Sequence, residues 1–184
     1  ETSPAINLIK NTISKVAPSG SRVLISGASG TGKELVARLI HRQSKRANAA
    51  FIVVNAASMS PDNMERELFG VEEDGIIIKT GVFEKAHGGT LFFDEVADMP
   101  QTTQAKILRI LTDQTFERVG GDLKVQVNVR VVSATSRNLR EEIDAGKFRE
   151  DLYHRLNVVP VRVPSLTQRR EDIPVLIKQM MISF

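Results

Sequence analysis

The sequence predicts an α/β fold in which a five-stranded, mainly parallel β-sheet lies between helices, with one β-hairpin inserted. Two observations lead to this prediction. Short, nearly continuous apolar runs alternate with segments of helical periodicity, and this alternation is typical of parallel sheets covered on both faces. A glycine-rich stretch, residues 27–34, also stands between an apolar run and a helical segment. The chain has 184 residues, which is long enough to bury such a core as one domain.

The elements follow one another in a regular order. Five apolar runs predict strands at 22–26, 51–54, 90–93, 131–134 and 158–163. Apolar residues at three- and four-residue intervals predict helices between Pro4 and Gly20, at 35–46, 64–69, 100–111 and 139–145, and from 171 onward. A turn at 120–122 joins 116–119 to 124–129 as a hairpin. The last strand contains Pro160, which places it near a sheet edge, and the segment 70–81 has no clear period.

Composition and charge exclude several classes of protein. The chain is 41% hydrophobic and 26% charged, and without cysteine it can hold no disulfide framework. Its longest apolar run, 49–54, is too short for a membrane span, and with no signal peptide the expected location is cytoplasmic. A net charge of +3 is too small to indicate nucleic-acid binding by this segment. The two ends of the sequence lead us to expect a domain cut from a longer protein.

Two further groups of polar residues are expected to carry no chemistry. Four basic residues at roughly helical spacing predict a solvated outer face: Arg38, Arg42, Lys45 and Arg46. Three histidines are scattered along the chain and lack the spacing of metal ligands: His41, His87 and His154.

The glycine-rich stretch matches a Walker A phosphate loop, with the residues Gly27, Ala28, Ser29, Gly30, Thr31, Gly32, Lys33 and Glu34. Glycines allow successive backbone N–H groups to point at phosphate oxygens, and the start of the following helix adds partial positive charge. Lys33 can then reach the terminal phosphates as a point charge. Glu34 departs from the general pattern, since Ser or Thr usually supplies a magnesium ligand at that position.

The strand at 90–93 ends at Asp94 and Glu95, which matches a Walker B strand. An aspartate at a strand tip can hold the Mg²⁺ of a bound nucleotide, directly or through water. The following glutamate can orient and activate an attacking water, so Glu95 favours hydrolysis over simple binding. Because ligands of parallel sheets bind beyond the carboxyl ends of the strands, both motifs are expected at one site.

Several motifs together resemble one family. Besides residues 27–34, they are Glu67-Leu68-Phe69-Gly70, 88–95, Phe116-Glu117-Arg118-Val119-Gly120-Gly121, Phe148-Arg149-Glu150-Asp151-Leu152, Arg155-Leu156 and Arg170-Glu171-Asp172-Ile173. This combination resembles the AAA+ domain of sigma-54-dependent transcription activators, most closely the NtrX type of nitrogen-related response regulator. The resemblance covers essentially the whole chain and implies a P-loop NTPase of AAA+ type. The family carries Glu at position 34.

The resemblance also implies roles for individual residues. It implies ATP or ADP with Mg²⁺ as cofactors, and it gives Asn55 the role of holding the catalytic Glu95 until the nucleotide state releases it. Thr135 resembles the sensor residue near the terminal phosphate, but Ser136 follows where the family often has Asn. Arg149 and Arg155 match arginines that reach a neighbouring subunit's nucleotide, which implies a homo-oligomer, as a ring or dimer.

One part of the family pattern is missing. Family members carry a loop with the sequence Gly-Ala-Phe-Thr-Gly-Ala that contacts the sigma factor, whereas residues 71–81 here are shorter and do not match it. The missing motif argues against contact with sigma-54. Residues 76–78, all isoleucine, could still form a small apolar tip, but they are expected to pack locally. The resemblance places 1–184 as the AAA+ core, cut at the start of a helical lid. A receiver domain and a helix-turn-helix domain would lie outside this chain.

Three functions therefore stand side by side. The first is an ATP-binding, ATP-hydrolysing domain of a two-component response regulator, in which nucleotide controls oligomerisation and hence transcription. A sensor histidine kinase and promoter DNA would be partners through the outside domains. The second is a sigma-54 activator that uses a non-standard contact loop. The third is a nucleotide-binding or oligomerisation module without catalysis, for which Ser136 and the short loop are the support.

Overall fold

A five-stranded parallel sheet forms the centre of the computed structural model, which describes residues 4–164. The strands are β1 (Val23–Ser26), β2 (Phe51–Asn55), β5 (Thr90–Asp94), β8 (Arg130–Thr135) and β9 (Val159–Arg162). Their order is β2-β5-β8-β1-β9, and every pairing is parallel. The predicted five-stranded α/β fold is thus confirmed. The strand containing Pro160 lies at an edge, where a residue without an N–H group costs least.

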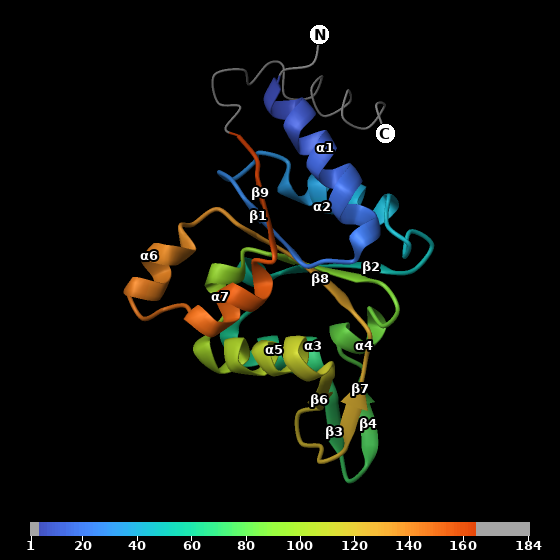
Figure 1. The fold of residues 1–184 in the computed structure, drawn as a ribbon. Helices are drawn as coiled ribbons and strands as arrows, with labels where there is room; N and C mark the ends of the chain where they lie inside the picture. Colours follow the sequence, from blue (N-terminus) through green and yellow to red (C-terminus); the bar gives the residue numbers. More distant parts are fainter. Residues whose placement is uncertain (1–3, 165–184) are drawn as a thin grey trace.

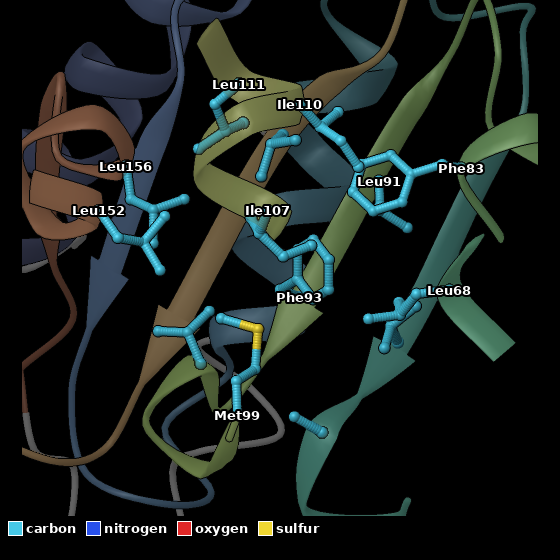
Figure 2. Close-up of a cluster of buried hydrophobic side chains, with 14 of the residues drawn as sticks. Leu68, Phe83, Leu91, Phe93, Met99, Ile107, Ile110, Leu111, Leu152 and Leu156 are labelled. Carbon is cyan, nitrogen blue, oxygen red and sulfur yellow. The ribbon is translucent and has the colours of Figure 1, made fainter. Parts of the chain in front are cut away.

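Helices cover both faces of this sheet (Figure 1). On one face lie α1 (Pro4–Ser19) and α2 (Lys33–Arg42), and on the other lie α3 (Pro61–Phe69), α5 (Gln101–Asp113), α6 (Leu139–Asp144) and α7 (Glu150–Leu156). Each face has its own buried cluster of aliphatic and aromatic side chains. Figure 2 shows part of the cluster on the face that α5 covers, where Phe93 and Leu91 of β5 lie beside Ile107 of α5.

The helices differ from the predicted ones at a few points. Helix α2 ends at Arg42 instead of residue 46, because turns follow it and Ser44 N donates to His41 O at 3.1 Å. Arg46 therefore does not lie on the solvated helix face that was predicted for it. Its guanidinium donates instead to the carbonyls of Gly89 and Asn128. Helix α7 and the short α4 (Val82–Lys85) were not predicted. The helix predicted from 171 onward lies outside the described residues.

Two antiparallel hairpins extend from one end of the molecule (Figure 1). One, β6 (Thr115–Glu117) with β7 (Lys124–Gln126), is the predicted hairpin. The other, β3 (Val71–Glu73) with β4 (Ile76–Lys79), falls in the segment without a clear period. Its turn, Asp74-Gly75, has positive φ angles of 51° and 79°. Asp-Gly favours such a turn, so the sequence did contain a hairpin signal there.

The tip of the β3–β4 hairpin does not have the local packing that was expected for residues 76–78. Ile76, Ile77 and Ile78 are 64%, 49% and 55% exposed, so they do not pack locally. The base of the hairpin is fixed instead, since Glu72 N donates to Val119 O and Val119 N donates to Gly70 O, both at 2.9 Å.

A buried arginine fixes α1 against the sheet. Arg130, the first residue of β8, is 3% exposed, and its guanidinium donates to the carbonyls of Val16, Ala17 and Ser21 at 2.8–3.0 Å. The bonds to Val16 and Ala17 reach carbonyl groups in the last turn of α1, where a helix leaves its carbonyls without partners of its own. Burial, with Arg46 nearby, lowers the pKa of Arg130 to about 10. Within residues 4–164, no helix is both long and apolar enough to cross a membrane.

Candidate functional site

The phosphate loop connects β1 to α2 at the carboxyl end of the sheet. Gly30 and Gly32 have φ angles of 79° and 93°, a conformation that favours glycine, and Gly32 is the residue before α2 begins. Gly27 is required for space, because a Cβ atom there would lie 2.7 Å from Val163 O. The loop is tied to the neighbouring strand, since Gly27 N donates to Thr135 O at 3.3 Å. Thr31 Oγ1 donates to Ala28 O at 2.8 Å within the loop.

Lys33 folds back onto the loop that precedes it. Its ammonium group donates to Gly27 O at 2.9 Å and Ala28 O at 2.8 Å, and the residue is 8% exposed. Burial lowers the pKa of Lys33, and the carboxylates of Asp94 and Glu95 oppose this shift. The ammonium is thus satisfied by backbone oxygens that the oxygens of a phosphate can replace.

Asp94 is the last residue of β5 and lies level with the carboxyl ends of the two neighbouring strands. It pairs in register with Asn55 of β2 and Ala134 of β8. Burial raises the pKa of Asp94, the ammonium of Lys33 opposes the rise, and Glu95 and Glu34 add to it. A lysine and carboxylates in such electrostatic contact are typical of functional sites.

One cavity of about 480 Å³ brings most of the predicted residues together. Its volume lies in the range of small-molecule sites. The lining residues predicted from the sequence are Ser29, Gly30, Gly32, Lys33, Glu34, Asn55, Asp94 and Glu95. Ser136, which follows Thr135 at the position where the family often has Asn, also lines the cavity, together with three residues that the sequence gave no role: Ala57, Asp98 and Arg137. Glu34 also accepts a hydrogen bond from Arg38 one helical turn away, at 3.2 Å.

Glu95 is held at the end of β8 and not by Asn55. Its Oε1 accepts from Thr135 Oγ1 at 3.0 Å, and its Oε2 accepts from Ser136 N at 2.8 Å and Ser136 Oγ at 2.9 Å. Its backbone is left-handed, with φ of 60°, which costs a non-glycine residue about 1–2 kcal/mol. Strain of this kind persists where surrounding contacts fix the conformation.

The predicted contact between Asn55 and Glu95 is therefore absent from the described structure. Asn55 Oδ1 accepts from Ala57 N at 3.0 Å and so caps the turn that follows β2. A strand-end asparagine commonly makes such a local bond with the backbone two residues on. Asn55 still lines the cavity, on the opposite side of β5 from Thr135.

Arg137 is a cation of the site that the sequence analysis did not name. Its Nη2 lies 2.7 Å from Asp98 Oδ1, and its Nη1 lies 3.8 Å from Glu142 Oε1. It lines the cavity together with Lys33. The available signal was its place two residues after Thr135, just past the strand end.

The structure places Arg149 and Arg155 outside this cavity. Arg149, next to the start of α7, is exposed and donates to both oxygens of Asp151, whose carboxylate raises the pKa of Arg149. Arg155, in the last turn of α7, is also exposed. Neither side chain serves the phosphate loop of its own chain.

The residues fit a metal ion only together with a ligand. In the described part of the chain, no group of three or more histidine, aspartate or glutamate side chains could hold a metal ion. Mg²⁺ usually takes one or two carboxylates, several waters and substrate phosphates, and Asp94 could supply such a carboxylate.

The parallel sheet, the phosphate loop and the acidic end of β5 define a P-loop NTPase domain of AAA+ type. A solved P-loop NTPase domain of a sigma-54 activator from E. coli has the same fold, with a TM-score of 0.61 at 20% identity over 88% of this chain and 95% of that chain. The family model of the sigma-54 interaction domain matches residues 1–162. The chain therefore belongs to the sigma-54 interaction domain family.

Relatives within the family are much more similar. The nitrogen assimilation regulatory protein NtrX of Azorhizobium caulinodans is 57% identical over 176 residues, and NtrC of Escherichia coli K12 is 49% identical over 182. These alignments cover 95% and 97% of this chain but 39% of each relative. A crystal structure of NtrX from Brucella abortus with ADP is 58% identical, with a TM-score of 0.89, over 100% of this chain and 41% of that one. The chain thus spans about two fifths of these relatives and is NtrX-like in sequence.

Proposed function

We propose that this chain binds ATP with Mg²⁺ and hydrolyses it, as the central domain of an NtrX-type response regulator that controls transcription. The observation that carries the proposal is the shared cavity of Lys33, Asp94 and Glu95 beside a glycine-rich loop. Crystal structures of NtrX from Brucella abortus in complex with ADP and with ATP support the choice of nucleotide.

The chemistry would use the groups in this cavity. Phosphate oxygens would replace Gly27 O and Ala28 O as partners of Lys33 and would accept hydrogen bonds from the loop N–H groups. Asp94, with phosphates and water, would hold Mg²⁺, which neutralises charge on the phosphate oxygens. Glu95 would accept a proton from the attacking water, and Thr135 would lie near the terminal phosphate.

Arg149 and Arg155 would complete the site of a neighbouring copy. Both are exposed and lie away from their own cavity, which supports a role in trans within a homo-oligomer, a ring or a dimer. Residues 1–184 would form the AAA+ core, with the lid, a receiver domain and a helix-turn-helix domain beyond it. Through those domains the whole protein would meet a sensor histidine kinase and promoter DNA in the cytoplasm.

The test is ATP turnover and nucleotide binding by Lys33→Ala and Glu95→Ala, with the exposed Lys45→Ala as control. We expect Lys33→Ala to lose the rise in melting temperature that ATP causes. Glu95→Ala should keep this rise but lose turnover by about 10²- to 10⁴-fold, the usual contribution of a general base. Turnover that is absent, or equal in all variants, would refute hydrolysis; binding without phosphate release would favour the non-catalytic module.

A second function, contact with sigma-54, is favoured by one observation. The exposed residues Ile76, Ile77 and Ile78 form an apolar tip where the family carries its sigma-contact loop. We would measure capture of sigma-54 by the parent and by Ile77→Ser, with an ATP transition-state analogue present. Capture that depends on Ile77 would support this function, and no capture by the parent would refute it.

A further inference from the structure

A buried glutamine connects the end of the central strand to the loop that carries Arg149. Gln104, near the start of α5, is 0% exposed. Its Nε2 donates to Met99 O at 2.8 Å and to Lys147 O at 3.0 Å, and its Oε1 accepts from Arg149 N at 2.9 Å. A buried side chain with such a set of hydrogen bonds is held in one position.

The three partners of Gln104 require an uncharged amide. Two carbonyl oxygens each need a donor and one main-chain N–H needs an acceptor, and a glutamine side chain supplies both donors and the acceptor from one planar group. Glutamate would place a carboxylate oxygen against carbonyl oxygens. Methionine has a similar volume but would leave all three main-chain groups without these partners. Filling the space is therefore not enough at this position.

One of the three bonds reaches the segment behind the acidic end of β5. Met99 follows the short 3₁₀ turn η2 (Val96–Asp98), and this turn begins directly after Glu95. Met99 N also donates to Val96 O at 3.2 Å, so Met99 and η2 form one closed turn. A shift of this turn therefore moves the carbonyl group that Gln104 holds.

The other two bonds reach the loop between α6 and α7, which presents Arg149. Lys147 and Arg149 flank Phe148, which is 3% exposed, so the loop is anchored while the side chain of Arg149 stays exposed. Gln101, at the start of α5, donates to Gly146 O in the same loop. Helices α5 and α7 also pack against each other (Figure 1). The start of α5 therefore fixes the main chain from which the exposed arginine extends.

We propose that Gln104 is a positioning residue that sets where Arg149 is offered to the cavity of a neighbouring copy, and that it ties this position to the turn behind Glu95. The inference rests on the proposed function, in which Arg149 acts in trans. Gln104 is not among the residues that line the phosphate cavity, so it acts only through the main chain of the loop. Its loss should weaken the neighbour's site and leave the cavity of its own chain intact.

The first test measures the loop and does not need hydrolysis. Hydrogen exchange at the main-chain N–H of Arg149 is followed by mass spectrometry in the parent, Gln104→Met and Thr103→Val. Thr103 is the matched control, because it is 1% exposed in the same helix and its hydroxyl has no hydrogen-bond partner within the described residues. Exchange should be about tenfold faster in Gln104→Met and unchanged in Thr103→Val. Equal exchange in all three proteins would overturn the proposal.

The second test is ATP turnover. Gln104→Met should be about 10- to 100-fold slower than the parent, since a misplacement of about 1 Å can cost that much, and Thr103→Val should keep the parent rate. The rise in melting temperature that ATP causes should be equal in the three proteins, because their own cavities are intact. Turnover of Gln104→Met equal to that of the parent would overturn the proposal.

An exposed residue of α5 replaces Gln104 in this test if Gln104→Met does not fold. Gln101→Ala removes the bond to Gly146 O at the surface and so loosens the same loop. It should lower turnover about two- to fivefold, in proportion to one net hydrogen bond. An unchanged rate in Gln101→Ala would then overturn the proposal.

The third test separates an effect on the neighbour from simple damage. Gln104→Met is mixed in equal amounts with Glu95→Ala, whose cavity lacks the base but whose loop offers Arg149 normally. In a head-to-tail assembly about half of the Gln104→Met cavities gain such a neighbour, so turnover per Gln104→Met chain should rise to about half the parent value. A partner that carries both Glu95→Ala and Arg149→Ala should give no such rise.

One further mixture distinguishes this inference from the proposed function. Arg149→Ala mixed with Glu95→Ala regains turnover whenever Arg149 acts in trans. If this mixture regains turnover and Gln104→Met with Glu95→Ala does not, the positioning role is wrong and the proposed function stands. If this mixture fails, or the parent shows no turnover, the trans arginine or hydrolysis itself is wrong. Hydrogen exchange at Arg149 then decides by itself whether Gln104 positions the loop.

Discussion

The phosphate cavity and the base of the two hairpins both bury charged side chains, but they satisfy them differently. In the cavity, Lys33 is paired with backbone carbonyls of its own loop and Glu95 with Thr135 and the exposed Ser136. At the hairpins, Arg118 donates to both oxygens of Glu84 and to Glu72, at 2.8–2.9 Å. These three side chains are 7–18% exposed.

The two regions also differ in the space around their charges. At the hairpins, a Cβ atom on Gly120 would lie 2.6 Å from Glu72 O. In the phosphate loop, Gly30 and Gly32 have nothing within 4 Å of such an atom. A ligand can thus replace the partners in the cavity, whereas the hairpin charges are paired with each other and enclosed. We therefore expect a ligand to replace the partners in the cavity and the hairpin bases to stay fixed.

The largest expected effect on stability is at the hairpins. Arg118→Ala would leave Glu72 and Glu84 buried without their counter-charge, which typically costs about 3–5 kcal/mol in free energy of unfolding. The hydrogen bonds to Glu84, and to a lesser extent to Glu72, raise the pKa of Arg118 against the effect of burial. The matched control is Arg109→Ala, whose exposed ion pair with Glu117 spans 3.9 Å and should contribute under about 1 kcal/mol. The measurement is the free energy of unfolding in urea for both variants. If Arg118→Ala and Arg109→Ala lose the same amount, the ion pairs of Arg118 do not fix the base of the hairpins.

A smaller effect measures how tightly the base is enclosed. Gly120→Ala and Gly146→Ala both place alanine at a positive φ, 80° and 74°, but only the first would meet another residue. We expect Gly146→Ala to cost about 1–2 kcal/mol from the backbone alone. Gly120→Ala should cost about 1–3 kcal/mol more because of overpacking against Glu72. The measurement is the unfolding midpoint of each variant. Equal midpoints for Gly120→Ala and Gly146→Ala would show that the hairpin base can accommodate the added methyl group.

In the cavity, strain at Glu95 can be measured separately from its side chain. Glu95→Gly and Glu95→Ala both remove the carboxylate, but only glycine adopts the φ of 60° without cost. The glycine variant should therefore be more stable to unfolding by about 1 kcal/mol. An alanine variant of equal or greater stability would argue against a strained backbone at this position.

The smallest expected effect concerns pH. Because the pKa of Asp94 is raised, its carboxylate takes up a proton at a higher pH than an ordinary aspartate. The protonated form cannot hold Mg²⁺, so affinity for Mg²⁺-ATP should fall as the pH is lowered through that raised pKa. Asp94→Asn should bind more weakly at every pH and lose this component of the pH dependence. The measurement is the affinity for Mg²⁺-ATP as a function of pH in the parent and in Asp94→Asn. If the affinity falls equally steeply with falling pH in both proteins, Asp94 does not hold the Mg²⁺.

The fold could be predicted because its determinants are local. Each strand of the sheet contains a short, nearly continuous apolar run, and the phosphate loop and the pair Asp94-Glu95 are contiguous motifs. The partners of Glu95 could not be predicted, since Ser136 lies 41 residues away and only the strand order brings it near. The ion cluster of Arg118 and Glu72, 46 residues apart, was missed for the same reason. At residues 76–78, hydrophobicity favoured local packing over an apolar tip, but the three isoleucines are 49–64% exposed at the end of the hairpin.

The most direct test of the central claim is phosphate release from Mg²⁺-ATP as a function of protein concentration, for the parent and Glu95→Ala. If the cavity hydrolyses ATP with help from Arg149 and Arg155 of a neighbouring copy, turnover per chain should rise cooperatively with concentration in the parent. It should stay about 10²- to 10⁴-fold lower in Glu95→Ala throughout. Turnover per chain that is independent of concentration and equal in the two proteins would contradict the account.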